Sequence, residues 1–432
     1  MTSTVLLLPR NGLRRLMAPN AGTSGAIRFK HSSADDLMLL SYVKVGEVGY
    51  QVPLAPKTHR LNQGDTGVNG LWFRVSVELH CWWYELIRRG DQFCVPRDEF
   101  VKRIPGPLTD PGALGYIVLT YAPGAAFPPH DVNPIPTFAA WFVTRDGVSG
   151  VNVAAEPAEV GTSRLAAHWP IDDLAKTTVT VVGVGSIGGA AVTALAGYGV
   201  GQLLLVDPDR LMWHNLVRHV LPGRHVGHFK VDALREHLAD QRSDTRIVPY
   251  RYDVVDDAHE IRGLLSTTDI VLCCADGVAP RRTVSHLARR AGKPAVLACV
   301  LDDGGIGEII RLRPFPDHGC LLCRRQALID DGTFDPEPAL EAGYGTGTLH
   351  QPMTAVGSDL AIVGDLAAKI TTATVLEKAG HYTHRLPGEQ LNLALQARRG
   401  WPGPYDLGYT GNTRWVPTVA PPRDDCPTCG KP

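Results

Sequence analysis

The chain has 432 residues, two to three times the length of a typical domain, so two or three domains are expected. Hydrophobic residues make up 44% of the chain and charged residues 20%, which excludes a mostly disordered or fibrous protein. The formal net charge of −1 excludes a protein that grips nucleic acid through an excess of cations.

The N-terminal third divides into two parts. Residues 1–34 contain basic side chains and no acid, which predicts a basic N-terminal tail, with a transit peptide as the alternative. Short β-rich runs at 71–77 and 116–121, separated by Pro-rich turns, predict a separate α+β domain over 35–160. Two of its histidines and two of its acids, namely His80, His130, Asp91 and Asp131, show no metal-ligand or catalytic-triad spacing. Its role is left open, and recruitment of a substrate or partner is one interpretation.

Short apolar runs alternate with amphipathic segments from about residue 176 to 320. The expected strands are 178–183, 202–207, 246–254, 269–274, 295–300 and 307–312. The expected helices are 186–198, 229–241 and 279–291, followed by 355–377. This alternation predicts an α/β fold with a doubly wound, mostly parallel, Rossmann-like sheet in a domain over 170–432. Residues 156–173 are expected to be a linker, 324–352 a long loop, and the last fifty residues loop-rich.

A glycine pattern joins the first expected strand of this domain to the helix after it. It reads Gly183-x-Gly185-x-x-Gly188, in which glycine permits a tight turn and close approach to a phosphate. Asp207 ends the next strand, where a carboxylate can accept from ribose hydroxyls. The pattern predicts nucleotide binding, and a NAD-dependent dehydrogenase fits it equally well.

Four further elements follow Asp207 in order. They are Asp209, the run Asn215-Leu216-Val217-Arg218, then Lys230, then Asp276. With the glycine loop, this order resembles the adenylating domain of the ThiF/MoeB/HesA superfamily, to which the ubiquitin-activating enzymes belong. The resemblance covers roughly 176–320 and the C-terminal cysteines. One departure is His219, where many members carry Gln.

The resemblance implies ATP-dependent adenylation of a carboxylate. Arg218 and Lys230 would stabilise charge at the α-phosphate, and Asp276 would hold Mg²⁺. The implied nucleotide-binding residues are Gly183, Gly185, Ser186, Gly188, Asp207, Asp209, Asn215, Arg218, Lys230 and Asp276. The substrate would be the C-terminus of a ubiquitin-like protein or peptide, and the chain would form a homodimer.

Four of the nine cysteines form two Cys-x-x-Cys pairs, which are Cys320 with Cys323 and Cys426 with Cys429. Two such pairs suit a structural Zn²⁺ with four thiolate ligands, which would tie the C-terminal region to the core. A redox role is the alternative. It is disfavoured on the expectation that neither pair opens a helix after a strand, as a thioredoxin-like motif does.

The other cysteines are expected to be inert. None lies in 324–352, where family members that form a thioester place their nucleophile, so an internal thioester is not expected. Packing is the expected role of the remaining five, Cys81, Cys94, Cys273, Cys274 and Cys299, with a nucleophile at Cys81 or Cys94 as the alternative. Three alternatives remain: a non-catalytic nucleotide-binding scaffold, an activating enzyme that passes its substrate to a separate thiol carrier, and a nicotinamide-dependent oxidoreductase.

The odd cysteine count argues against a disulfide framework and favours a reducing compartment, so the expected location is the cytoplasm. No apolar run reaches the roughly 18 residues that a transmembrane helix needs.

Overall fold

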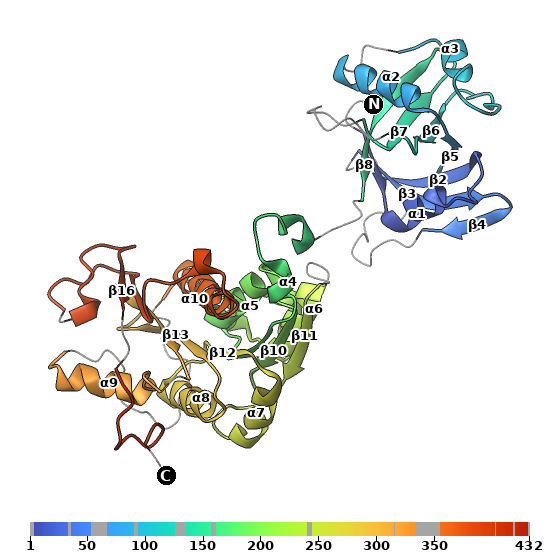
Figure 1. Ribbon diagram of the computed structural model, residues 1–432. Coiled ribbons are helices and arrows are strands. Elements are labelled where there is room, and N and C mark those ends of the chain that lie inside the picture. The colour runs from blue at the N-terminus through green and yellow to red at the C-terminus, as the bar shows by residue number, and fades with distance from the viewer. Residues whose placement is uncertain are drawn as a thin grey trace. The chain divides into compact units, whose positions relative to one another are not determined.

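The structure is a computed structural model. It describes residues 4–32, 36–52, 67–89, 94–125, 135–156, 161–239, 244–314, 316–333, 355–401, 403–417 and 420–430. The chain divides into two compact units, Met1–Val160 and Gly161–Pro432, which are described separately (Figure 1).

The first unit is built on one eight-stranded sheet. Its strands are β1 (Val5–Leu8), β2 (Ser24–Ser32), β3 (Leu37–Val45), β4 (Val48–Gln51), β5 (Gly67–Arg74), β6 (Tyr116–Tyr121), β7 (Phe138–Val143) and β8 (Val148–Ala155). The helices are α1 (Arg10–Met17), α2 (Val77–Arg89) and α3 (Arg97–Val101). Strand β1 pairs with both β8 and β3, so the sheet closes on itself. Two buried clusters fill the unit, one around Phe29 and Trp72 and one around Phe100 and Trp141.

The prediction of a basic tail over 1–34 is wrong for most of that segment. Residues from Val5 to Ser32 form β1, α1 and β2, all within the closed sheet or packed on it. The apolar side chains of α1, such as Leu13 and Leu16, are buried, whereas Arg14 and Arg15 on the same helix face solvent. Arg14 and Arg15 therefore lie on the solvent-exposed side of a folded helix.

The second unit contains a sheet in the order β11-β10-β9-β12-β13-β14-β15-β16 (Figure 1). Its strands are β9 (Thr178–Val182), β10 (Gln202–Val206), β11 (Arg246–Tyr250), β12 (Ile270–Cys273), β13 (Ala295–Leu301), β14 (Ile306–Leu312), β15 (Gln390–Ala394) and β16 (Thr413–Val416). The first five strands of that order are parallel. Strands β14 to β16 pair antiparallel. The α/β class is confirmed, and the sheet is mixed because three antiparallel strands extend it.

Helices connect the successive parallel strands of this unit, and further helices precede β9 and lie between β14 and β15. They are α4 (Ile171–Leu174), α5 (Ser186–Gly197), α6 (Lys230–Ala239), α7 (Ala258–Leu264), α8 (Val278–Arg290), α9 (Leu321–Asp330) and α10 (Gly357–Lys378). The expected linker contains α4 and a 3₁₀ turn at Thr162–Leu165, and its residues 157–160 lie outside the described part of the chain. Helices α7 and α9 and strands β15 and β16 are additional to the sequence-based predictions.

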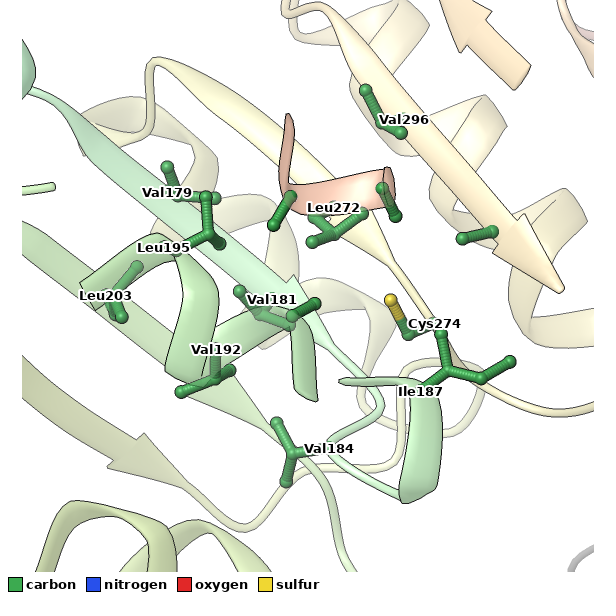
Figure 2. Close-up of a cluster of buried hydrophobic side chains, with 14 of the residues drawn as sticks. Val179, Val181, Val184, Ile187, Val192, Leu195, Leu203, Leu272, Cys274 and Val296 are labelled. Carbon is green, nitrogen blue, oxygen red and sulfur yellow. The ribbon is translucent and has the colours of Figure 1, made fainter. Parts of the chain in front are cut away.

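The core of the second unit has two parts, one between the sheet and α5, α6 and α10, and the other between the opposite face of the sheet and α7 and α8. Figure 2 shows side chains from β9, α5, β10, β12 and β13 packed in one apolar cluster. Helices α5 and α10 approach closely because α5 is rich in small residues and α10 carries Gly364. A Cβ at Gly364 would lie 2.3 Å from the carbonyl oxygen of Ile187, so only glycine fits there. This packing fixes the start of α5, which is also one wall of the cavity described below.

Strands β9 and β12 are neighbours in the sheet, yet the chain leaves them in opposite directions along it. In open α/β sheets, ligands bind outside the carboxyl ends of the strands at such a switch point. Within the part of the chain that the structure describes, no helix has the length and apolar character needed to cross a bilayer.

Candidate active site

A cavity of about 730 Å³ opens at the switch point. Its walls come from the ends of β9, β10 and β12, the turn after β11, the segment 215–219 and the first residue of α6. Cavities of several hundred Å³ suit a nucleotide-sized ligand. Nine of the ten residues that the sequence predicts as nucleotide-binding line it: Gly183, Gly185, Ser186, Asp207, Asp209, Asn215, Arg218, Lys230 and Asp276.

The tenth, Gly188, supports the loop from behind. A Cβ at Gly188 would lie 1.9 Å from the carbonyl oxygen of Gly183, so the helix packs directly on the loop. Gly183 has a φ of +79°, and a Cβ there would lie 2.5 Å from the backbone of Ala275. Gly185 has open space around its missing Cβ. The loop therefore brings bare backbone and the N-terminus of α5 to the cavity, which is a favourable site for an anion.

Asp207 anchors this loop. Its Oδ2 accepts a hydrogen bond from the Val184 amide at 2.8 Å, and its Oδ1 accepts one from the Asp209 amide at 2.8 Å. The side chain is buried, and desolvation raises its pKa although the nearby Lys230 ammonium acts in the opposite direction. Each carboxylate oxygen can accept a further hydrogen bond, and Asp207 lines the cavity.

Lys230 is the first residue of α6 and is held among carboxylates. Its Nζ lies 2.8 Å from Oδ2 of Asp209. Burial disfavours the ammonium, but the charges of Asp207, Asp209 and Asp276 outweigh that effect, so the pKa of Lys230 is raised. A fixed positive charge therefore stands in the cavity wall at neutral pH.

Arg218 and Asp276 face the same space. The buried Nε of Arg218 has no hydrogen-bond partner among the described residues. Asp276 follows β12 and is open to solvent at the cavity, and the protein around its carboxyl group raises its pKa by desolvation. The charges of Arg218 and Lys230 lower that pKa. The cavity thus offers an unsatisfied cationic donor and a carboxylate, which suits an anion accompanied by a metal ion.

Asn215 and His219 hold the segment that carries Arg218. Oδ1 of Asn215 accepts from the Met212 amide at 2.8 Å. Nδ1 of His219 accepts from the Leu221 amide at 3.1 Å, which makes Nε2 the protonated nitrogen that donates to the carbonyl of Val184 at 2.9 Å. His219 therefore ties this segment to the glycine loop. Its place in the structure explains how the chain tolerates a departure from the family pattern, since a Gln amide offers the same donor and acceptor.

Burial lowers the pKa of His219 from 6.5 to about 4. Above pH 6.5 both the folded and unfolded states are neutral at this position, and as the pH falls from 6.5 toward 4 only the unfolded state takes up the proton. We therefore expect His219 to cost about 2 kcal/mol of stability between about pH 7 and pH 5. Urea unfolding of the parent and His219→Gln at both pH values measures this, and the variant should lose less stability. Equal losses would show that His219 is not the titrating group.

The four cysteines of the two pairs come together. Their sulfur atoms all lie within 4.8 Å of one another, with 3.6 Å between Cys320 and Cys426 and 3.9 Å between Cys320 and Cys323. Tetrahedral zinc with Zn–S bonds of about 2.3 Å requires sulfur atoms about 3.8 Å apart. The Arg423 amide donates to the Cys323 sulfur at 3.4 Å. The donor set and spacing fit a four-thiolate zinc ion.

The expectation that neither cysteine pair opens a helix after a strand is wrong. Cys320 immediately precedes α9, and α9 follows β14, so the first pair does open a helix after a strand. What separates this arrangement from a two-cysteine redox motif is the second pair, which lies against the first across more than a hundred residues of sequence.

The remaining cysteines divide into buried and exposed thiols. Cys273 and Cys274 lie in apolar clusters, as expected, and burial raises the pKa of Cys273 to about 11. Cys299 is half-buried, with its sulfur 2.8 Å from a guanidinium nitrogen of Arg281. The packing expected of Cys81 and Cys94 is wrong, because both are exposed.

In the first unit, His80 has a structural role. It is fully buried, with Nδ1 2.7 Å from the Pro136 carbonyl oxygen and Nε2 2.8 Å from the hydroxyl of Thr120. Asp91, His130 and Asp131 lie outside the described residues, as does 334–354, which is most of the expected long loop. The first part of that loop is helical, because α9 extends to Asp330.

Parts of the chain are similar in sequence to known proteins. The chain is 40% identical over 139 residues to the "Adenylyltransferase and sulfurtransferase uba4" of Aspergillus fumigatus, which covers 32% of this chain and 28% of that protein. It is 26% identical over 151 residues to the "Sulfur carrier protein ThiS adenylyltransferase" of Escherichia coli, covering 35% of this chain and 59% of that protein. The chain thus spans less than a third of the uba4 protein and about three fifths of the ThiS adenylyltransferase. The solved structure of E. coli MccB with ATP has a TM-score of 0.43 and 18% identity, and covers 60% of this chain and 68% of that one.

The ThiF family matches residues 161–396, which is more than half of the 432 residues and includes every residue of the cavity. The chain belongs to the ThiF family.

Proposed function

We propose that this protein is an ATP-dependent adenylyltransferase. It converts a carboxylate, the C-terminal carboxylate of a ubiquitin-like protein or a peptide, into an acyl-adenylate and releases pyrophosphate. The observation that carries the proposal is the cavity at the switch point, where Arg218, Lys230 and Asp276 face a glycine loop and a helix N-terminus. The names of the relatives, which are adenylyltransferases, support it.

In this reaction an oxygen of the substrate carboxylate attacks the α-phosphorus of ATP. A C–O–P linkage forms, the bond from the α-phosphorus to the bridging oxygen breaks, and pyrophosphate leaves with the electron pair. The guanidinium of Arg218 and the ammonium of Lys230 would stabilise the negative charge that accumulates around the phosphorus. The ion pair with Asp209 keeps the ammonium in the cavity before the nucleotide arrives.

The donor set also fits a magnesium ion. Mg²⁺ is usually held by one or two carboxylates together with phosphate oxygens. Asp276 and Asp209 are carboxylates open to solvent at the cavity, and both lie near enough to Lys230 to raise its pKa, so they would hold the ion, which would neutralise phosphate charge. Asp207 would then be left to accept from the ribose hydroxyls, since it is buried deeper in the loop.

A structural zinc ion completes the proposal. Cys320, Cys323, Cys426 and Cys429 would hold it, and it would join the C-terminal residues 420–430 to α9. The Gly319 amide already donates to the carbonyl of Ala420 at 2.8 Å, so the backbone on both sides of the site is in contact. Zinc there supplies stability and takes no part in the chemistry.

The strongest rivals are a nicotinamide-dependent oxidoreductase and a catalytically idle scaffold. Hydride transfer needs no cation pair beside the phosphates, so Arg218 and Lys230 favour adenylation. A scaffold would bind ATP without turning it over. Incorporation of labelled pyrophosphate into ATP, with candidate small proteins or peptides as acceptors, distinguishes the enzyme from both. Absence of exchange together with tight ATP binding would support the scaffold.

The acyl-adenylate is expected to react with a nucleophile from outside the chain. The cysteine at the described cavity is Cys274, whose thiol lies in the apolar cluster and whose pKa burial raises far above its usual value (Figure 2). A thiol is the reactive nucleophile only as a thiolate. The expected long loop, residues 324–352, contains no cysteine.

We therefore expect no thiol-sensitive adduct between enzyme and substrate in the presence of ATP and Mg²⁺. Non-reducing gels with and without thiol, run with intact-mass measurement, check this. Cys81→Ala and Cys94→Ala are the informative variants, because both side chains are exposed. A thiol-sensitive band that disappears in either variant would show that the substituted cysteine, in the first unit, is the nucleophile that receives the acyl group.

We also propose a homodimer. Large apolar side chains are exposed on the second unit, among them Trp213 (74%), Val217 (67%), Val356 (61%) and Ile362 (47%). Val217 and Val356 belong to one surface, because a Cβ at Gly357 would lie 3.2 Å from the carbonyl oxygen of Val217. Exposed apolar patches mark interaction sites. Sedimentation should show a dimer that Trp213→Asp weakens, and a monomer at all concentrations would contradict the proposal.

A further inference from the structure

We propose that His225, His228 and Glu236 form a second metal site, which takes a divalent transition-metal ion such as Zn²⁺, Co²⁺ or Ni²⁺. One ring nitrogen of each histidine and one carboxylate oxygen of Glu236 lie within 4.8 Å of one another. The group is separate from the four cysteines, and the proposal does not depend on the proposed function.

Local backbone structure brings these three residues together. His225 ends a 3₁₀ turn (Gly223–His225), and the His228 amide donates to the carbonyl of His225 at 3.0 Å. This turn places the two rings edge to face with their centroids 6.0 Å apart. Glu236 lies in α6, which begins two residues after His228. The site is therefore formed by one continuous stretch of chain.

The state of His225 is the second observation that points to a ligand. The residue is 1% exposed, and its buried Nε2 has no hydrogen-bond partner among the described residues. A buried polar atom without a partner is unfavourable, and native structures rarely keep one without a reason. A metal ion bound at Nε2 would remove that cost.

The other two ligands have the freedom to close on an ion. His228 and Glu236 are both exposed, so their side chains can rotate to bonds of about 2.0–2.2 Å. Two imidazoles and one carboxylate favour zinc and its neighbours over Mg²⁺ or Ca²⁺, which prefer oxygen ligands alone. Three protein ligands leave the fourth position of a tetrahedral ion to water.

The site lies next to the proposed catalytic machinery without being part of it. Lys230 begins α6, and its backbone amide donates to the carbonyl of Asp209 at 2.9 Å. An ion bound by His225, His228 and Glu236 would join the 3₁₀ turn to α6 and stabilise the segment that leads to Lys230. Metal binding to the folded state raises the melting temperature, by an amount that grows with the metal concentration relative to its dissociation constant.

The test uses the full chain with its thiolate-held zinc in place, after dialysis against a weak chelator. Zn²⁺ and Co²⁺ are titrated by calorimetry, and Co²⁺ also by visible absorption. The variants are His228→Ala and Glu236→Gln, each removing one exposed ligand. The matched control is His259→Ala, since His259 is an exposed histidine on α7 with a side chain 73% accessible.

The parent and His259→Ala are expected to bind one ion beyond the thiolate-held zinc. In His228→Ala and Glu236→Gln the affinity should fall at least about tenfold. The added Co²⁺ should show ligand-field bands without sulfur-to-cobalt charge transfer, and added Zn²⁺ should raise the melting temperature of the parent more than that of His228→Ala.

Three results would overturn the proposal. They are no additional ion bound by the parent, unchanged affinity in both ligand variants, and charge-transfer bands showing that the added cobalt enters the cysteine cluster. Because the readouts are binding, spectrum and melting temperature, they stand apart from any assay of adenylation.

Discussion

Asp276→Asn and Lys230→Ala should each lower ATP–pyrophosphate exchange by about 10²–10³-fold, because each removes a charged group aimed at the reacting phosphates. Asn keeps the shape of the Asp276 side chain but loses the charge that is proposed to hold Mg²⁺. Ala at 230 removes the ammonium that now pairs with Asp209 at 2.8 Å. Exchange rates are measured beside thermal melts, so that lost activity is separated from lost fold.

The matched controls are Asp172→Asn and Lys176→Ala. Both side chains belong to exposed residues of the same unit, outside the cavity, so the same changes of charge should leave exchange within about twofold of the parent. Unchanged exchange in a folded Asp276→Asn or Lys230→Ala variant would remove that residue from the catalytic assignment.

Cys320→Ser and Cys429→Ser should release the tightly held zinc and lower the melting temperature. The free energy of structural zinc binding is part of the free energy of folding, so loss of one of four thiolates destabilises the region that the ion joins. The ATP cavity is built by other residues, so nucleotide binding should persist in both variants below their melting temperatures.

Elemental analysis and melting curves check this prediction. Cys81→Ser is the control, because Cys81 is an exposed cysteine of the other unit and should leave both measurements unchanged. Less than about a tenth of an equivalent of zinc in protein purified without chelators would contradict a structural ion there.

The alternating strands and helices of the second unit could be predicted because the sequence signal of each element lies within its own residues. The run 178–183 became β9, and 355–377 became α10, with ends differing by one or two residues. Buried parallel strands are continuous apolar runs, so they can be recognised in the sequence without knowing which strands they pair with. Nine of the ten residues proposed to bind nucleotide line one cavity, and the order of their motifs along the chain is the signal that identified them.

Other elements depend on partners far away in the chain. Strand β15 has the sequence QLNLA, whose Gln390 and Asn392 argue against a core strand, yet both are buried. Gln390 donates to Glu308 at 3.1 Å, and Asn392 donates to the Pro404 carbonyl at 3.0 Å. These polar contacts depend on residues outside β15, including the neighbouring strand β14. The sequence of β15 alone therefore does not predict them.

The N-terminal segment shows the same limit. Its charge composition suggested a tail, but β1 gains its stability by pairing with β3 and β8 and by burying Leu6 and Leu8. A strand of four residues is too short to be predicted from hydrophobic periodicity. The closed sheet of the first unit therefore emerges only from pairings between distant residues.

Detection of the adenylate itself tests the central claim most directly. The protein is incubated with Mg²⁺, ATP and candidate small proteins or peptides, each supplied with a free and with an amidated C-terminus, and the acceptors are analysed by intact-mass spectrometry. The account predicts that an acceptor with a free carboxylate gains the mass of AMP, that its amidated form does not, and that Asp276→Asn abolishes the product. NAD(H) displacing ATP from the cavity, or ATP binding with no adenylate on any acceptor, would contradict it.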